Sequence, residues 1–315
     1  MLQPRRLIDL GNRIHLVDGY DLGVAGRTGT YVICEEQLTL VETSASPSVP
    51  YILRGLQDLG LDPKEVRYII VTHIHLDHSG GAGLLLKSCP NGNVVVHPKG
   101  ARHLAHPQRL IEGARAVYGE KFDELFDPIL PIPEDKLITM ADQDTLRIGP
   151  HCLLQFLDTP GHANHHFSIY DSVSNGIFTG DTIGVYYPEL VQQGAALYLP
   201  STSPNQFNPE DMMESMERIR QLNVDRIYFG HFGMSEEPSE VYRQLEYWLP
   251  LFLNTAEQAF TDEKSEEAIA ARLYQQVEDW LTDRGISTND SVYSMIQLDL
   301  EVGAKGLFDY IKKKR

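Results

Sequence analysis

The stretch Thr72–Gly81 reads THIHLDHSGG and directly follows VRYIIV, a run rich in β-branched residues that predicts a buried strand. Because side chains alternate along an extended backbone, His73 and His75 are expected to lie on one side and to reach one cation. Asp77 and His78 follow where the chain turns. Imidazole nitrogen and carboxylate oxygen are ligands that zinc and related ions take. The stretch therefore predicts a metal site at the end of a strand.

Three later motifs place the same residue types after predicted strands. They are TPGH at Thr159–His162, FTGD at Phe178–Asp181 and FGHFG at Phe229–Gly233. In the second motif Gly180 precedes the aspartate and allows a close approach of the backbone. A His or Asp thus ends a predicted strand at four separate places in the chain.

The whole pattern, T-H-x-H-x-D-H with S-G-G and then the three later motifs in order, resembles that of the metallo-β-lactamase superfamily. It is similar to bacterial zinc-dependent hydrolases of the glyoxalase II and lactonase type. The resemblance implies an α+β fold, the four-layer αββα metallo-β-lactamase sandwich with a C-terminal helical extension. We therefore expect a catalytic domain at residues 1–250 and a helical C-terminal extension at residues 251–315.

The resemblance also implies two divalent metal ions, with zinc as the expected metal and iron or manganese as alternatives. Carried over position by position, the ligands form two groups of three and one bridging residue: His73, His75 and His162; Asp77, His78 and His231; and Asp181.

These ligands imply a hydrolase that cleaves a small ester, thioester or lactone. The nucleophile would be a metal-bridging hydroxide, since water shared by two cations loses its proton near neutral pH. Asp77 would give a proton to the leaving group. Tyr187 and its neighbour Tyr186 follow Asp181 and offer phenols that can hydrogen-bond a developing oxyanion. Filling of the pocket wall is an equally good interpretation of these two aromatic side chains.

Other activities stay open, because one fold supports many chemistries. A mononuclear-iron oxidation like that of persulfide dioxygenases would use only His73, His162 and Asp181. Phosphodiester hydrolysis and a regulatory protein that binds metals without catalysis are the remaining alternatives.

One turn departs from the family pattern, which usually reads V-D-T-G. Here Val41–Ser44 reads VETS. Glu42 is expected to brace the metal loop through a hydrogen bond, although its longer side chain and the missing glycine change the geometry. Five further histidines are not expected to bind metal. His165 and His166 are expected to support the ligands, and His97, His103 and His106 to belong to a segment that covers one face of the domain.

Composition restricts the partners. Lys+Arg 27 against Asp+Glu 44 gives a net charge of −17, which disfavours nucleic acids and anionic membranes. The 3 cysteines show no C-x-x-C spacing, so a disulfide framework is not expected. The amino terminus has two arginines, Arg5 and Arg6, but no signal-peptide core follows them, and no run predicts a membrane span. We expect a cytoplasmic enzyme with a small-molecule substrate, either monomeric or a homodimer.

Secondary-structure patterns predict two similar halves of the catalytic domain. Short β-type runs separated by turn residues fill Ile14–Glu42 and return in Lys136–Thr179. The segment Lys99–Phe126 has an irregular helical pattern, and only helical periodicity follows Glu236. We expect Lys99–Phe126 and the C-terminal helices to form the walls of the substrate pocket.

Overall fold

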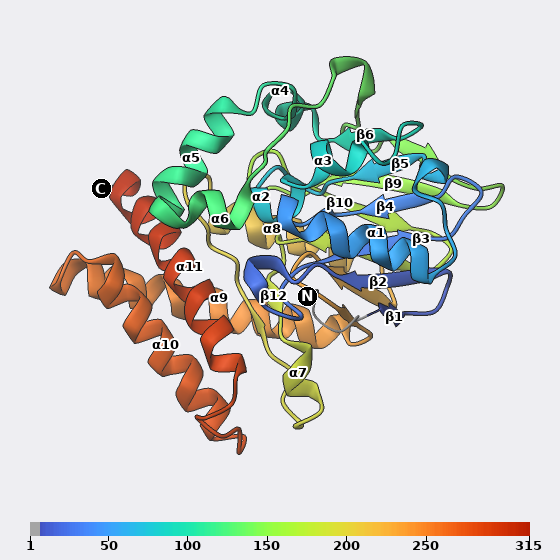
Figure 1. The fold of residues 1–315 in the computed structure, drawn as a ribbon. Coiled ribbons are helices and arrows are strands. Elements are labelled where there is room, and N and C mark those ends of the chain that lie inside the picture. Colours follow the sequence, from blue (N-terminus) through green and yellow to red (C-terminus); the bar gives the residue numbers. More distant parts are fainter. Residues whose placement is uncertain (1–6) are drawn as a thin grey trace. The chain divides into compact units, whose positions relative to one another are not determined.

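The structure is a computed structural model that describes residues 7–315 (Figure 1), so Arg5 and Arg6 lie outside the described residues. The chain divides into two compact units. Unit 1 contains residues 7–158, 165–180 and 225–235, and unit 2 contains residues 159–164, 181–224 and 236–315. Each unit is therefore assembled from separate stretches of the chain.

A seven-stranded sheet in unit 1, called sheet A, has its strands in chain order. The first four strands are antiparallel, and the next three continue parallel to the fourth. The parallel part is rich in Val and Ile, as expected of strands buried on both faces. The strands are β1 (Leu7–Asp9), β2 (Ile14–Asp18), β3 (Gly29–Ile33), β4 (Thr39–Val41), β5 (Tyr68–Ile70), β6 (Asn93–Val96) and β7 (Leu137–Thr139).

Unit 1 also contains a six-stranded sheet, called sheet B, with strand order β15-β14-β11-β10-β9-β8. All neighbouring strands are antiparallel except β11 and β14. The strands are β8 (Thr145–Arg147), β9 (Leu153–Asp158), β10 (Phe167–Asp171), β11 (Gly176–Gly180), β14 (Arg226–Phe229) and β15 (Met234–Ser235). The β-type runs predicted in both halves of the sequence are therefore confirmed as strands.

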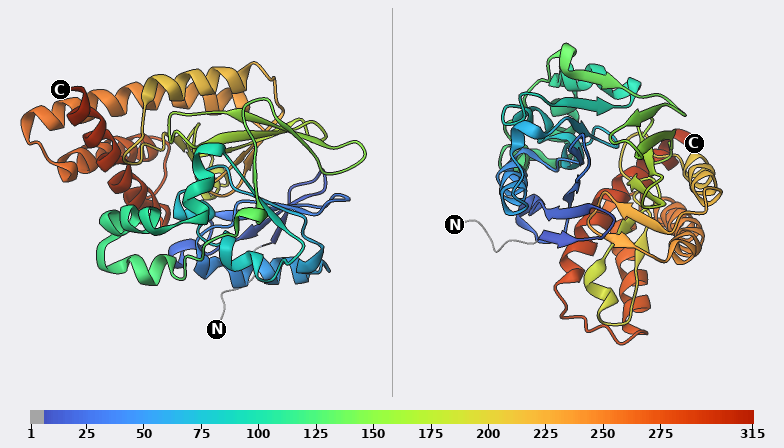
Figure 2. Two further views of the ribbon diagram at one scale, coloured as in Figure 1. Left: turned by 90° about the horizontal axis from the view of Figure 1, so that it is seen from above. Right: turned by 90° about the vertical axis from the view of Figure 1, so that its right-hand side faces the viewer.

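Alternating side chains of sheet A enter two different cores. On β3, Tyr31 and Ile33 join the apolar cluster that lies between sheets A and B, whereas Val32 joins the cluster on the other face of sheet A. Helices α1 (Val49–Asp58) and α3 (Ala82–Leu86) bury their apolar residues in this second cluster. Unit 1 is therefore layered as helices, sheet A and sheet B (Figure 2).

The covering segment predicted at Lys99–Phe126 is helical and belongs to unit 1. Its helices α5 (Gln108–Tyr118) and α6 (Phe122–Phe126) pack on Leu76 through a small apolar cluster that includes the buried rings of Phe122 and Phe126. Leu76 begins a short helix immediately before Asp77, so this cluster lies directly against the histidine-rich stretch. The remaining helices of unit 1 are α2 (Leu76–Ser79), α4 (Pro98–Ala105), α5 (Gln108–Tyr118) and α6 (Phe122–Phe126), with 3-10 turns at Asp21–Gly23, Ser46–Ser48, Pro63–Glu65, Gly119–Lys121 and Glu134–Lys136.

Unit 2 is mainly helical, as the periodicity after Glu236 predicts. The apolar stripe of α10 and that of α11 are buried at Ile269, Leu273, Val277 and Leu281, and at Val292, Ile296, Leu300, Leu307 and Ile311. The expected boundary after residue 250 falls within α9, which continues through Pro250. The elements are β12 (Val185–Tyr186), α7 (Pro188–Val191), β13 (Tyr198–Leu199), α8 (Pro209–Arg220), α9 (Pro238–Asp262), α10 (Glu266–Thr282) and α11 (Val292–Lys314).

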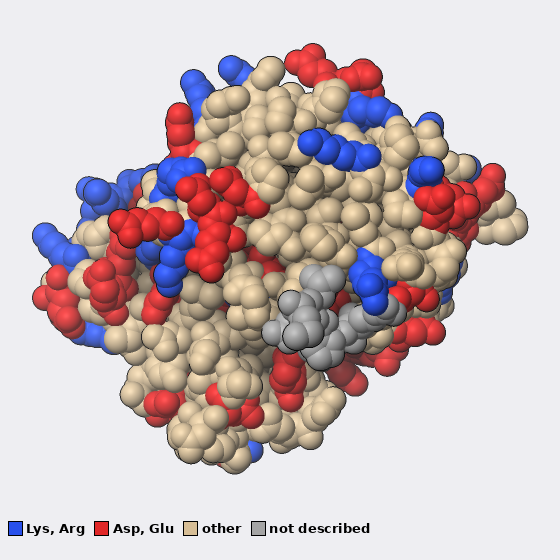
Figure 3. All heavy atoms as spheres, viewed as in Figure 1, with Lys and Arg blue, Asp and Glu red and all other residues tan. Residues whose placement is uncertain are grey.

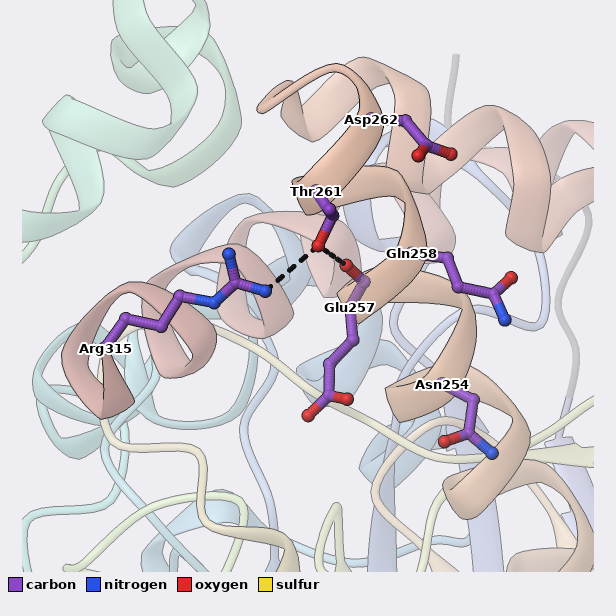
Figure 4. A pocket seen from close by; sticks show the side chains of 6 residues that line it. All are labelled: Asn254, Glu257, Gln258, Thr261, Asp262 and Arg315. Atoms are coloured by element: carbon purple, nitrogen blue, oxygen red, sulfur yellow. Dashed lines mark hydrogen bonds between the residues drawn. The ribbon is translucent and has the colours of Figure 1, made fainter.

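The end of α11 is fixed by contacts within unit 2. Lys313 Nζ donates to the carbonyl of Asn205 at 2.6 Å, and Arg315 Nη2 donates to Thr261 Oγ1 at 3.0 Å. Figure 4 shows the second contact at an open polar pocket, which is lined by Asn254, Glu257, Gln258, Thr261, Asp262 and Arg315. None of the helices within residues 7–315 combines the length and the hydrophobicity that a membrane-spanning segment requires.

Candidate metal centre

The stretch that follows β5 brings its first two histidines together. His73 Nε2 lies 3.1 Å from His75 Nδ1, and the two rings meet edge to face. His73 is fully buried, and His75 is the residue directly before α2. The two imidazoles therefore lie close enough to reach one cation, although the strand itself already ends at Ile70.

Asp77, His78 and His231 form a second group within unit 1. The three offered ligand atoms lie within 4.8 Å of one another. Asp77 Oδ2 is 3.8 Å from His78 Nε2 and 3.7 Å from His231 Nε2. Both histidines are buried, whereas the Asp77 side chain keeps 17% of its surface exposed. Two imidazole nitrogens around one accessible carboxylate make a donor set suited to zinc or a related ion.

A tyrosine on sheet A holds the loop that carries His231. The fully buried Tyr31 hydroxyl lies 2.6 Å from the carbonyl oxygens of both Phe229 and Gly233, which flank His231. The loop closes with Phe229 N donating to Gly233 O at 3.0 Å, and both Phe232 and Gly233 have positive φ. Burial raises the pKa of Tyr31 well above its usual value, so the phenol stays a donor. Sequence reasoning missed Tyr31, because β3 and the FGHFG motif lie far apart in the chain.

Glu42 braces the metal loop, as expected. Its buried carboxylate accepts hydrogen bonds from the hydroxyl of Thr72 and, at 3.3 Å, from the Thr72 backbone N–H. Its second oxygen lies 3.5 Å from His78 Nδ1. The backbone at Glu42 has φ +67°, and Thr43 N donates to the carbonyl of His78 at 2.9 Å. The VETS turn therefore holds the loop through both side chain and backbone.

A buried ion pair interacts electrostatically with the Asp77–His78–His231 group. Arg27 Nε lies 3.3 Å from Asp21 Oδ2, and both side chains are almost fully buried. Burial raises the pKa of Asp21 to about 6, with Arg27 acting in the opposite direction and Asp77 adding to the rise. Asp21 is thus easier to protonate than an exposed aspartate.

His162 and Asp181 lie together in unit 2, with His162 Nε2 3.7 Å from Asp181 Oδ2. His162 Nδ1 lies 3.0 Å from the carbonyl oxygen of Ser201, so Nδ1–H donates and Nε2 is the nitrogen that can bind a metal. The Ser201 hydroxyl donates to Asp181 Oδ2 at 3.2 Å, and the Ser203 hydroxyl lies 3.3 Å from His162 Nε2. Sequence reasoning did not identify either serine.

Glycines in two motifs are required by the local geometry. A Cβ at Gly180, which has φ +47°, would overlap the hydroxyl of Thr72 and the ring of His166. A Cβ at Gly161 would overlap the backbone of Met212 at the start of α8. Gly180 therefore lies beside the residue that precedes His73, and Asp181 is the next residue in the chain.

Three further histidines, His165, His166 and His97, have supporting or structural contacts. The ring of His166 lies 5.1 Å from that of His73, and the ring of His165 lies 5.6 Å from that of His75. His97 caps α4 by accepting from the backbone N–H of Lys99, and its Nε2 lies 3.1 Å from a carboxylate oxygen of Asp158.

The two tyrosines after Asp181 have different surroundings. Tyr187 is fully buried, and its hydroxyl donates to Asp299 Oδ2 on α11 at 2.9 Å. Tyr186 stacks on Tyr198, with ring centroids 5.0 Å apart. The phenol of Tyr187 is thus oriented by a carboxylate that no sequence motif indicated.

Comparisons with known proteins support the motif analysis. A family model described as the metallo-beta-lactamase superfamily matches residues 25–231. The metallo-beta-lactamase fold-containing protein ST1585 of Sulfurisphaera tokodaii is 28% identical over 208 residues, 65% of this chain and 72% of that protein. The N-acyl homoserine lactonase of Bacillus thuringiensis is 25% identical over 194 residues, 61% of this chain and 66% of the lactonase.

A solved structure shows the same fold. The crystal structure of ST1585 from Sulfolobus tokodaii is 23% identical and superimposes with a TM-score of 0.65, covering 93% of this chain and 97% of that one. At this level of identity the likeness concerns the arrangement of strands and helices.

Proposed function

The chain belongs to the metallo-β-lactamase superfamily and has its α+β fold with a C-terminal helical region, and from this premise we propose that it is a dinuclear-metal hydrolase of a small ester, thioester or lactone. The observation that carries the proposal is the Asp77–His78–His231 group, whose ligand atoms lie within 4.8 Å of one another. This second set supplies ligands for a second ion, and the one-iron alternative stays open beside it.

In the proposed centre each ion has three ligands of its own and shares one bridging carboxylate. As the motif resemblance implies, His73, His75 and His162 would hold the first ion, Asp77, His78 and His231 would hold the second, and both ions would share Asp181. The contacts within each unit support this assignment, because they fix ligand orientations through Glu42, Tyr31 and Ser201. Zinc suits the nitrogen and oxygen donors best, with iron and manganese as alternatives.

When bound, the two ions supply an activated water and a Lewis acid for the substrate oxygen. The side chains of the chain then have separate tasks. Asp77 keeps part of its side chain exposed beside His78 and His231, so it can pass a proton to the leaving atom of the substrate. Tyr187 donates to Asp299, and this bond orients its phenol. A phenol donates a single hydrogen, so Tyr187 would bind the oxygen on which charge develops by exchanging its bond to Asp299 for one to the substrate.

Apolar side chains near Asp77 support the proposed substrate class. Leu76 packs against α5 and α6, and half-buried apolar side chains of this cluster include Leu110, Ile111 and Tyr118. We propose that this cluster borders the substrate, where it would suit the apolar acyl part of an ester or a lactone. The lactonase relative is consistent with this class.

Nucleic acid is a poor partner for this chain. The net charge is −17, and on the face shown in Figure 3 basic and acidic side chains are interspersed rather than gathered into a basic patch. A small-molecule substrate, a cytoplasmic location and either a monomer or a homodimer remain our predictions.

The proposal is tested by metal analysis and a substrate screen. Protein purified without added cations should contain about two divalent ions per chain. It should hydrolyse esters, thioesters or lactones and leave phosphodiesters intact. One iron per chain, with oxygen uptake on persulfides, would instead establish the oxidative alternative.

A further inference from the structure

A short segment of unit 2 contacts both of that unit's predicted metal ligands. We call residues 200–203 the support loop. Its Ser201 carbonyl fixes the His162 ring through Nδ1, and the Ser201 hydroxyl donates to Asp181. Ser203 also reaches His162 Nε2. The position of this loop therefore sets the orientation of two residues that come from different motifs.

The support loop lies directly on the backbone of α11. Thr202 Oγ1 donates to the carbonyl of Gly303 at 2.9 Å. A Cβ at Gly306 would overlap the carbonyl of Thr202 and would lie 2.6 Å from the carbonyl carbon of Ser203. Because these atoms belong to the backbone, no side-chain rotation can make room, and the loop can lie here only against a glycine.

The same helix holds the loop that leaves Asp181. Asp299 lies one turn before Gly303 and accepts the hydrogen bond of Tyr187. Tyr187 is fully buried, so this carboxylate fixes a phenol that water does not reach. One face of α11, formed by Asp299, Gly303 and Gly306, thus contacts the chain at two places after Asp181, at Tyr187 and at the support loop.

We propose that α11 is a positioning element of the metal centre. Its Asp299–Gly303–Gly306 face seats the support loop and so orients His162 and Asp181 for metal binding. The inference rests on the proposed function. Groups that orient metal ligands typically change metal affinity by about 10–100-fold when they are altered.

A purely structural role of α11 predicts a different result. In that case its variants would lower the melting temperature of the metal-free protein and leave metal affinity unchanged. Thermal stability of the metal-free protein and metal affinity must therefore be measured on the same full-length variants.

The central variant is Gly306→Ala, and its matched control is Gly113→Ala. Gly113 lies within α5, and a Cβ there would meet nothing within 4 Å. Both changes add one methyl group to a helix. Zinc affinity is measured by competition with a chromophoric chelator, and ligand geometry by the visible spectrum of the Co²⁺-loaded protein.

We expect Gly306→Ala to bind zinc about 10–100-fold more weakly and to alter the cobalt spectrum, with Gly113→Ala matching the wild type. Should Gly306→Ala not fold, Thr202→Val keeps the side-chain shape and removes only the hydrogen bond to Gly303; a weaker affinity is expected there too. Wild-type affinity and spectrum in Thr202→Val, and in Gly306→Ala when it folds, would overturn the inference. A wild-type protein that binds no divalent ion would overturn the proposed function itself.

Discussion

The carboxylate of Glu42 faces the ring of His78, with Oε2 3.5 Å from Nδ1, while the other carboxylate oxygen accepts from Thr72. This single side chain links the VETS turn to the start and the end of the histidine-rich stretch. It occupies the position where the family usually has the shorter aspartate.

Glu42→Asp should weaken metal binding although it restores the family's usual residue. The side chain becomes one methylene shorter and cannot keep both Thr72 and His78 as partners. We expect a loss of about tenfold in affinity for the second ion. Glu42→Gln is the control, since it keeps the length and the contact with Thr72, and a chelator titration that ranks Gln below Asp would contradict the proposed brace.

Tyr31→Phe should loosen the His231 loop. The change leaves two buried carbonyl oxygens, those of Phe229 and Gly233, without the Tyr31 donor, at a cost of about 1–3 kcal/mol in unfolding free energy. The control is Tyr242→Phe, because the buried Tyr242 hydroxyl has no hydrogen-bond partner among residues 7–315. Urea unfolding measures the difference, and equal effects of the two changes would argue against the assigned role of Tyr31.

Asp171→Asn should destabilise the protein in a pH-dependent way. Burial alone would raise the pKa of Asp171, but hydrogen bonds from Arg13 and Ser174 hold it below its usual range. A depressed carboxyl pKa stabilises the fold above about pH 4, and this contribution is lost as the pH falls through the folded-state pKa. We expect Asp171→Asn to lower the free energy of unfolding by about 3 kcal/mol at pH 7 and by less at pH 3.

The control for Asp171 is Asp123→Asn. Arg115 also lowers the pKa of Asp123, but this pair is exposed and should change stability little at either pH. Unfolding curves at pH 7 and pH 3 measure these differences. An equal loss of unfolding free energy at both pH values for Asp171→Asn would contradict the proposed pH dependence.

Chelation should abolish hydrolysis, and Zn²⁺ should restore it. Asp181→Ala should lower both metal content and turnover, since its carboxylate offsets the repulsion of two cations about 3.5–4 Å apart. Asp77→Ala should spare the first ion more than Asp181→Ala does. Metal content of the two variants checks this, and two retained ions with wild-type turnover in Asp181→Ala would show that the bridging residue is misassigned.

Local patterns in the sequence predicted most elements of both sheets and the pairing of His73 with His75. Both depend on period-two alternation and on turn residues, which act over short distances. The expected boundary after residue 250 instead falls inside α9. The contacts of Glu42 with Thr72 and His78 confirm that it braces the loop. This role could be expected because the family pattern marks that position.

The supporting residues could not be found from sequence. Tyr31, Ser201 and Asp299 act through contacts with residues far away in the chain, and a lone tyrosine, serine or aspartate carries no spacing signal. Gly303 and Gly306 likewise look like poor helix formers until the backbone they touch is known.

The contact of Gly306 with the support loop also has a consequence for the order of events during synthesis. Every predicted metal ligand leaves the ribosome before α11 does, since the last of them is His231 and α11 begins at Val292. If α11 seats the support loop as proposed, the nascent chain carries all its ligands while His162 and Asp181 still lack their final orientation. Tight metal loading would then wait for α11 to be made and docked, so a growing chain would not trap an ion in an unfinished site.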